Sequence, residues 1–227
     1  SVTSLSVSGN LEKALPLCPR LTELSSVFGP PEFKLVSSWP NAIQITKLSI
    51  TTYNVFEIGS LQQLCHSCPN IASLSLSIGS NFPEADWKSM ALLLRLEELT
   101  IHAGRFGVAS GEGVFTALSK AEGAAPLKKI DLVDMRINAY PLFSSSRCKM
   151  MRKLKLRGCD VSTKAMTALV ENAGKCIDRI FLGGSSTRLA TPILEEECSR
   201  LKFIFFNSTS IDLINKLDSK IRSLITI

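Results

Sequence analysis

The sequence predicts an α/β solenoid, in which each turn of the coil adds one strand to a parallel sheet and returns through a helix. Three observations support this fold class. A short apolar pattern recurs about every 25 residues along the chain. The segments between its copies carry apolar residues at helical spacing. The chain has 227 residues and is 45% hydrophobic, so it is long and apolar enough for a continuous core.

The recurring pattern is an apolar residue, two variable residues and a second apolar residue, usually followed two positions later by a third. In the copy that begins at Met151, the second and third apolar residues are Leu154 and Leu156. This pattern, at a period of roughly 20 to 29 residues, is the signature of leucine-rich repeats. We therefore expect one leucine-rich-repeat domain over 1–227, with about ten repeats. The copies begin at Val2, Leu21, Ile45, Ile71, Leu96, Leu127, Met151, Ile177, Leu201 and Ile221.

The return segments between these strands are predicted to be helical. Within 163–176, apolar residues lie along one helical face, namely Ala165, Met166, Leu169, Val170 and Ala173. Because each strand lies inside and each helix outside, the stack is expected to bend into an arc, with the parallel sheet on the concave face and the helices on the convex face. The other predicted return helices lie in 59–68, 87–95, 113–123, 191–200 and 211–220.

Cysteines recur at fixed places in some repeats. Cys-Pro opens 18–24 and 68–76, and Cys159 follows the third apolar residue in 151–176, a segment that ends with Cys176. These segments resemble the cysteine-containing leucine-rich repeats of F-box proteins. The whole chain resembles leucine-rich repeats in its architecture, and roughly a third of it resembles the cysteine-containing subclass. It implies a protein-recognition module, and more specifically the substrate-recognition module of an F-box type ubiquitin ligase.

The number and spacing of the cysteines indicate the compartment. Seven scattered cysteines suit free thiols in a reducing environment better than a disulfide framework, so we expect an intracellular protein, cytoplasmic or nuclear. Cys159 is predicted to pack inward, where a thiol donates a weak hydrogen bond to the backbone. Cys18, Cys68 and Cys176 precede strands and are interpreted in the same way.

No motif indicates catalysis or a metal site. Cys65, His66 and Cys68 make at most half of a zinc site, and no second cluster of ligands accompanies them. His66 and His102 belong to different repeats and lie in no nucleophile signature. The Gly-rich segment 104–113 lacks the Gly-Lys-Ser/Thr ending of a phosphate-binding loop. We therefore expect a chain that is not an enzyme and has no catalytic residue, no metal site and no cofactor.

The ends of the chain and its hydropathy lead to two further expectations. No apolar run approaches the roughly 18 residues that a membrane helix needs, so no membrane association is expected. The chain begins directly on a repeat strand without an initiator Met and finishes on the apolar 223–227, with no polar cap. Terminal repeats need such caps. We therefore expect a fragment of a longer protein, whose flanking domain or partner covers the end repeats.

The predicted binding surface is the outward face of the strands. Side chains flanking the second apolar residue of each repeat point away from the core, because strand side chains alternate. These residues are mostly Ser and Thr in the first four repeats, whereas cations and aromatic rings follow. A basic rim around aromatic anchors suits an acidic, partly apolar segment of a protein partner. The predicted partner-binding residues are Lys129, Lys153, Lys155, Arg157, Arg179, Phe181, Phe203 and Phe205.

Three functions compete for this surface. The leading interpretation is a non-catalytic protein–protein interaction scaffold. The second is nucleic-acid or polyphosphate binding through the same cations and Lys202, with the Phe rings stacking on bases. The third is an immune-type or cytoskeletal repeat scaffold that binds elsewhere. As an alternative to a binding role, the Phe rings are covered by a terminal cap or by another domain. The insertion at 103–113 offers a second candidate binding surface.

Overall fold

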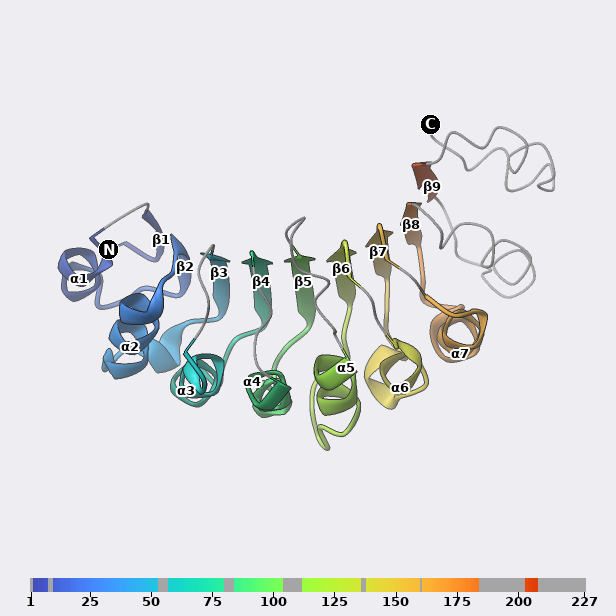
Figure 1. The fold of residues 1–227 in the computed structure, drawn as a ribbon, viewed down its shortest axis with the longest axis horizontal. Coiled ribbons are helices and arrows are strands. Elements are labelled where there is room, and N and C mark those ends of the chain that lie inside the picture. The colour runs from blue at the N-terminus through green and yellow to red at the C-terminus, as the bar shows by residue number, and fades with distance from the viewer. Residues whose placement is uncertain are drawn as a thin grey trace.

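The computed structural model describes residues 2–7, 10–52, 57–79, 84–103, 112–135, 138–159, 161–183 and, through their backbone, 203–207. Nine strands form a single parallel sheet in which spatial order follows chain order (Figure 1). The strands are β1 (Ser4–Val7), β2 (Glu23–Val27), β3 (Lys47–Thr52), β4 (Ser73–Ile78), β5 (Glu98–Ala103), β6 (Lys129–Val133), β7 (Lys153–Arg157), β8 (Arg179–Gly183) and β9 (Phe203–Asn207).

Helices connect the successive strands from β1 to β8 and lie along one side of the sheet (Figure 1). This is the α/β class predicted from the sequence, in a solenoid-like arrangement. Four short 3-10 helices add to them: η1 (Leu15–Leu17), η2 (Ala42–Gln44), η3 (Ser89–Leu92) and η4 (Ser146–Cys148). The α-helices are α1 (Leu11–Ala14), α2 (Pro30–Ser38), α3 (Ser60–Ser67), α4 (Glu84–Lys88), α5 (Glu112–Ser119), α6 (Tyr140–Phe143) and α7 (Thr163–Ala173).

The strands pair in the register that the repeated pattern predicts. Leu48 of β3 lies opposite Leu24 of β2 and Leu74 of β4, and the same alignment continues to Ile180 of β8. These residues are buried against the helices. Parallel pairing is thereby confirmed for the first nine copies of the pattern, whereas the tenth copy, at Ile221, lies outside the described residues.

The helix predictions are confirmed in part. Helices α3 and α7 lie within the predicted segments 59–68 and 163–176, and α5 covers only the first part of 113–123. The segment 87–95 holds the end of α4 and the 3-10 helix η3. The segments 191–200 and 211–220 lie outside the described residues. Helix α2 was not predicted, because its Pro30-Pro31 start looks like a loop. Proline is nevertheless well tolerated in the first turn of a helix, and Glu32 Oε2 accepts a hydrogen bond of 2.8 Å from the Gly29 N–H.

Three of the four cysteines predicted to pack inward are buried, and Cys176 is the exception. Cys159 is fully buried, and its Sγ donates to the carbonyls of Leu132 at 3.5 Å and Arg157 at 3.4 Å. Burial raises the pKa of Cys159 to about 11 and that of Cys68 to about 12. Cys18 is buried, whereas Cys176 is only half-buried, and none of the six described cysteines forms a disulfide. Thiols with such raised pKa values are poor nucleophiles and poor metal ligands.

Among the described residues, one cation lies in the core. Arg147 is 2% exposed, and one of its terminal nitrogens donates to the Leu96 carbonyl at 3.0 Å. The Arg147 carbonyl accepts from the Leu127 N–H at 2.6 Å. Its Nε and second terminal nitrogen have no hydrogen-bond partner among the described residues. Burial lowers the pKa of this guanidinium. Arg147 therefore ties neighbouring turns of the chain together with only part of its donors satisfied.

Candidate functional site

The strands present their outward side chains on the sheet side opposite the helices, which we call the open face. Register alignment places these side chains in rows that cross the strands, with neighbours about 4.8 Å apart. The middle row changes character along the sheet, from hydroxyls to charges and then to the aromatic ring of Phe181. Its members are Ser6, Ser25, Ser49, Ser75, Thr100, Asp131, Lys155 and Phe181, and Phe205 is the backbone register partner of Phe181 on β9.

A second row carries most of the other predicted cations. Lys129, Lys153 and Arg179 are register partners on β6, β7 and β8, and Phe203 follows them on β9. Arg157 lies at the end of β7, two residues beyond Lys155. The structure thus brings the eight predicted partner-binding residues onto four neighbouring strands. The side chains of Phe203 and Phe205 lie outside the described residues, so only their strand positions are known.

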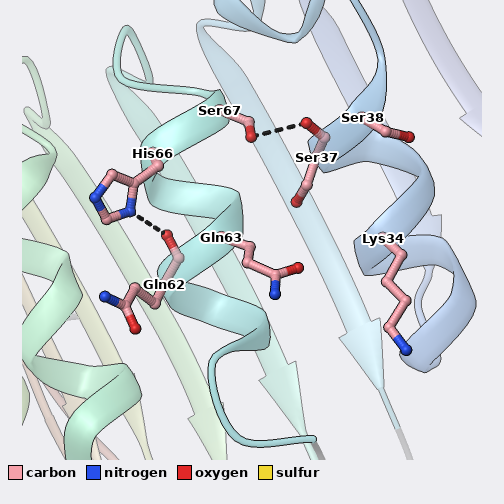
Figure 2. A pocket seen from close by; sticks show the side chains of 7 residues that line it. All are labelled: Lys34, Ser37, Ser38, Gln62, Gln63, His66 and Ser67. Carbon is pink, nitrogen blue, oxygen red and sulfur yellow. Dashed lines mark hydrogen bonds between the residues drawn. The ribbon is translucent and has the colours of Figure 1, made fainter.

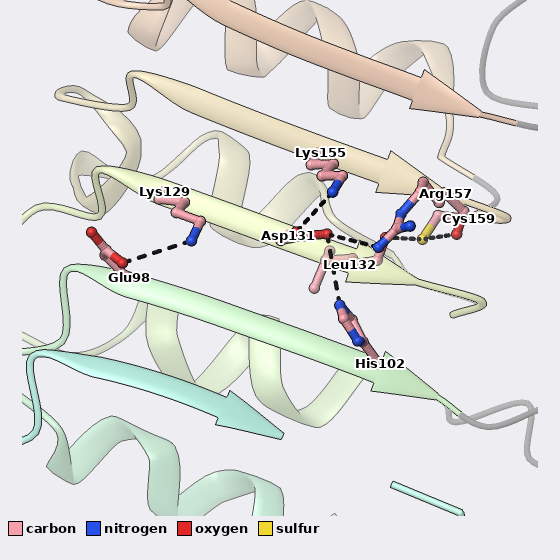
Figure 3. Close-up of polar contacts among 8 residues, drawn as sticks. All are labelled: Glu98, His102, Lys129, Asp131, Leu132, Lys155, Arg157 and Cys159. Carbon is pink, nitrogen blue, oxygen red and sulfur yellow. Dashed lines mark hydrogen bonds and ion pairs between the residues drawn. The ribbon is translucent and has the colours of Figure 1, made fainter. Parts of the chain in front are cut away.

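Asp131 of β6 is the centre of a charged cluster on the open face (Figure 3). Its side chain is only 13% exposed. Lys155 Nζ lies 3.5 Å from Oδ2, and Arg157 and His102 lie 3.9 and 4.0 Å from Oδ1. All three distances exceed the roughly 2.7–2.9 Å of a charge-assisted hydrogen bond to a carboxylate. The carboxylate is therefore surrounded by basic groups without a close contact to any of them.

Several polar atoms of this cluster are buried without a partner. Among the described residues, no hydrogen bond reaches Asp131 Oδ1, His102 Nε2 or Arg157 Nε. Burial lowers the pKa of His102, and Arg157 and Lys155 lower it further, while Asp131 opposes them. His102 is accordingly neutral at pH 7, and the cations that balance Asp131 at this pH are Lys155 and Arg157.

The remaining cations of the open face differ in how they are paired. Lys129 Nζ lies 3.8 Å from Glu98, and Arg179 Nε lies 3.9 Å from its neighbour Asp178. Lys153 has no acidic group within 4 Å among the described residues, although it lies between Lys129 and Arg179 in the row. These cations are equivalent in the repeated sequence pattern, whereas the structure distinguishes the paired ones from Lys153.

Phe181 is the aromatic residue of the open face whose side chain the structure describes. It is half-buried, and Lys155 Nζ lies 5.3 Å from the ring centroid. This distance is within the range of a cation–π contact. Part of the ring is therefore covered by Lys155, whose ammonium group also faces Asp131.

The first four strands form a different surface. A shallow hollow of about 250 Å³ opens above them, lined mainly by serines of the rows just described. Glu23 and Lys47 form a 2.7 Å ion pair at its edge, which lowers the pKa of Glu23 and raises that of Lys47 through their hydrogen bond. Both side chains are well exposed, so solvent screens this pair. The hollow offers hydroxyls and almost no net charge.

A second hollow, of about 480 Å³, lies on the helix side between α2 and α3 (Figure 2). Ser67 Oγ donates to the Ser37 carbonyl at 2.9 Å across the two helices, and His66 Nδ1 lies 2.8 Å from the Gln62 carbonyl. Hydroxyls and carboxamides dominate its lining, which contains no carboxylate. Within the described parts of the chain, no group of three or more His, Cys, Asp or Glu side chains is arranged to hold a metal ion.

Comparison with known sequences identifies no relative of this chain. No protein-family model matches the chain, and no curated protein shows significant similarity to it. The fold itself defines a class, an α/β protein whose parallel sheet grows by one strand per turn with helices along one side. None of the described helices has the length and apolar content needed to cross a membrane.

Asp131 and His102 are the site residues that the sequence analysis missed. The repeated pattern places both on the outward side of their strands, but the predicted partner-binding residues include neither of them. The signal that identifies Asp131 is its place in the middle row, where the preceding strands carry Ser or Thr and the next carries Lys155. Within the insertion 103–113, predicted as a second candidate surface, residues 104–111 lie outside the described residues.

Proposed function

We propose that the chain is a leucine-rich-repeat solenoid of about ten repeats, curved so that the open face is concave, and that it acts as a non-catalytic scaffold for a protein partner. The regular pattern of apolar residues and the single parallel register support the repeat assignment. In such solenoids the extended concave surface is the usual binding surface. The partner accordingly binds on the open face.

The observation that carries this proposal is the gathering of five cations and Phe181 on β6, β7 and β8. Three acids, Glu98, Asp131 and Asp178, lie within 4 Å of these cations. Five positive charges against three negative charges leave a net charge of +2. A positive surface with an aromatic anchor suits an acidic, partly apolar segment of the partner.

The resemblance of 151–176 to F-box type repeats supports a narrower proposal. We infer that the chain is the substrate-recognition module of a ubiquitin ligase that works in the cytoplasm or nucleus. The buried thiols of Cys159 and Cys68, which form no disulfide, are those expected of a protein in a reducing compartment. Co-purification with the adaptor of a ubiquitin ligase tests this narrower proposal.

Selection from a random peptide library tests the binding proposal. We expect enrichment of peptides that combine Asp or Glu with Leu, Phe or Trp, and a loss of about tenfold or more in their affinity for Lys153→Glu. Lys47→Glu is the matched control, because Lys47 occupies the same row on β3. Peptides that show no acidic enrichment, or that bind both variants equally, would contradict the proposed surface.

Nucleic-acid binding is the second candidate, and the same net charge of +2 with a stackable ring favours it. Affinity for single-stranded RNA, measured against salt concentration, distinguishes the two functions. Neutralising Z phosphates gives a slope of roughly −0.7Z in a plot of log affinity against log salt. A slope of about −2 or steeper, with RNA bound more tightly than the selected peptides, would favour the nucleic-acid function.

A further inference from the structure

Asp131 occupies an unusual place on the open face. Its register partner on β5 is Thr100, and its partner on β7 is Lys155. Among the described outward residues of the middle row, Asp131 is the only acid. Its side chain is 13% exposed, compared with 47% for Glu98, the other acid on this part of the face. An outward strand residue that only has to be polar can be Ser or Thr, as on the preceding strands. A largely buried carboxylate is costly and is not needed for that purpose.

The contacts of Asp131 are loose. Lys155 Nζ and an Arg157 terminal nitrogen lie 3.5 and 3.9 Å from its oxygens, and no hydrogen bond reaches Oδ1 among the described residues. The two cationic side chains are 28% and 37% exposed, so each also faces solvent. Both cations can therefore be approached by an external anion while they balance the internal one.

We propose that Asp131 is a specificity-determining residue, an internal carboxylate that competes with the partner's acidic group for Lys155 and Arg157. This inference rests on the proposed function of the open face. A partner carboxylate that approaches either cation is repelled by Asp131 or must share the cation with it. Both effects lower the affinity for an anion that contacts only this cluster.

The competition selects among anions. Lys153 has no described acid within 4 Å and is not neutralised in the same way. An acidic segment that reaches Lys153 and also packs on Phe181 gains contacts that Asp131 does not oppose. A small anion, or a polyanion without apolar groups, gains less. Asp131 therefore favours a mixed acidic and apolar segment over simple negative charge.

Substitution of Asp131 tests the inference directly. The probe is a fluorescein-labelled peptide in which Glu alternates with Leu, and binding is measured by fluorescence anisotropy. We expect Asp131→Asn to bind the probe about five- to tenfold more tightly than the wild type. Asp131→Thr, which matches Thr100 in the same row, provides a second variant should the amide disturb folding. Circular dichroism confirms that each variant is folded.

Two controls separate competition from a general change in charge. Glu98→Gln removes the same charge one strand away, and we expect less than a twofold effect because Glu98 is exposed. In the Lys155→Gln/Arg157→Gln background, the gain from Asp131→Asn should disappear, because the contested cations are gone. A gain that persists in that background, or one that Glu98→Gln reproduces, would refute the inference.

Failure of the inference is distinguishable from failure of the proposed function. If the wild type and Asp131→Asn bind the probe with equal affinity, or the variant binds more weakly, the internal carboxylate does not compete and only the inference is wrong. If neither protein binds the probe, both the inference and the acidic-partner proposal are wrong. Binding by Asp131→Asn alone would support both.

Discussion

The open face has two halves that share one backbone geometry and differ in chemistry. The hydroxyl half, β1–β4, presents serines and threonines around an exposed Glu23–Lys47 pair, whereas the charged half, β5–β8, presents a cluster around a buried carboxylate. Register is continuous across both halves. The comparison shows that the repeat fixes where side chains are presented, while the residues at the outward positions decide what they can bind.

The largest expected effect tests whether the two halves are equally well packed. Leu76 of β4 and Leu156 of β7 are both fully buried at equivalent repeat positions. We expect Leu76→Ala and Leu156→Ala each to lower the free energy of unfolding by about 2 to 5 kcal/mol, because each leaves a cavity. Urea denaturation followed by circular dichroism measures both. A large difference between them would show that one half is much more loosely packed.

Two glycines sharpen the comparison at the turns. Gly59 and Gly158 both have left-handed backbones, with φ of 89° and 60°, but only Gly158 has a neighbour, the Asp134 carboxylate, in the space that a methyl group would fill. We expect Gly158→Ala to cost about 2 to 4 kcal/mol and Gly59→Ala about 1 kcal/mol. Thermal unfolding compares the two. Equal losses would mean that Asp134 moves aside freely.

Two buried charges differ in how well they are satisfied. Asp86, beneath the hydroxyl half, accepts from the N–H groups of Gly59 at 3.1 Å and Gln62 at 3.2 Å, whereas Arg147 leaves two nitrogens without described partners. We expect Asp86→Ala to lower the free energy of unfolding by about 1 to 3 kcal/mol. Arg147→Met should cost about 1 kcal/mol or less, because it replaces a poorly paired buried charge. The reverse order in urea denaturation would contradict this.

The smallest expected effect is a pH dependence confined to the charged half. Burial lowers the pKa of His102, so as pH falls below about 6.5 the unfolded chain binds a proton before the folded one does. The folded state therefore loses stability as pH falls from that value towards the folded pKa. Urea midpoints between pH 7 and pH 5 should fall less for His102→Gln than for the wild type. Identical slopes would show that His102 does not titrate differently on folding.

Much of the fold was predictable because it depends on periodicity. The alternation around Leu154 and Leu156 placed Lys153, Lys155 and Arg157 outward, and the structure has them there. Helix α2 was missed because its Pro30-Pro31 start is characteristic of loops as well as of helix beginnings. The pairing of cations with acids was not predictable, because the partners lie on different strands of the sheet.

By itself, the sequence determined the parallel order of the strands, the buried cysteines and the positions of the outward cations, since each follows from local spacing repeated along the chain. Only the tertiary structure decided which of those cations are balanced. Asp131 is separated from His102, Lys155 and Arg157 by 24 to 29 positions along the chain, yet it lies within 4 Å of each of them in space. Electrostatic interactions depend on distance through space, and the sheet register sets that distance.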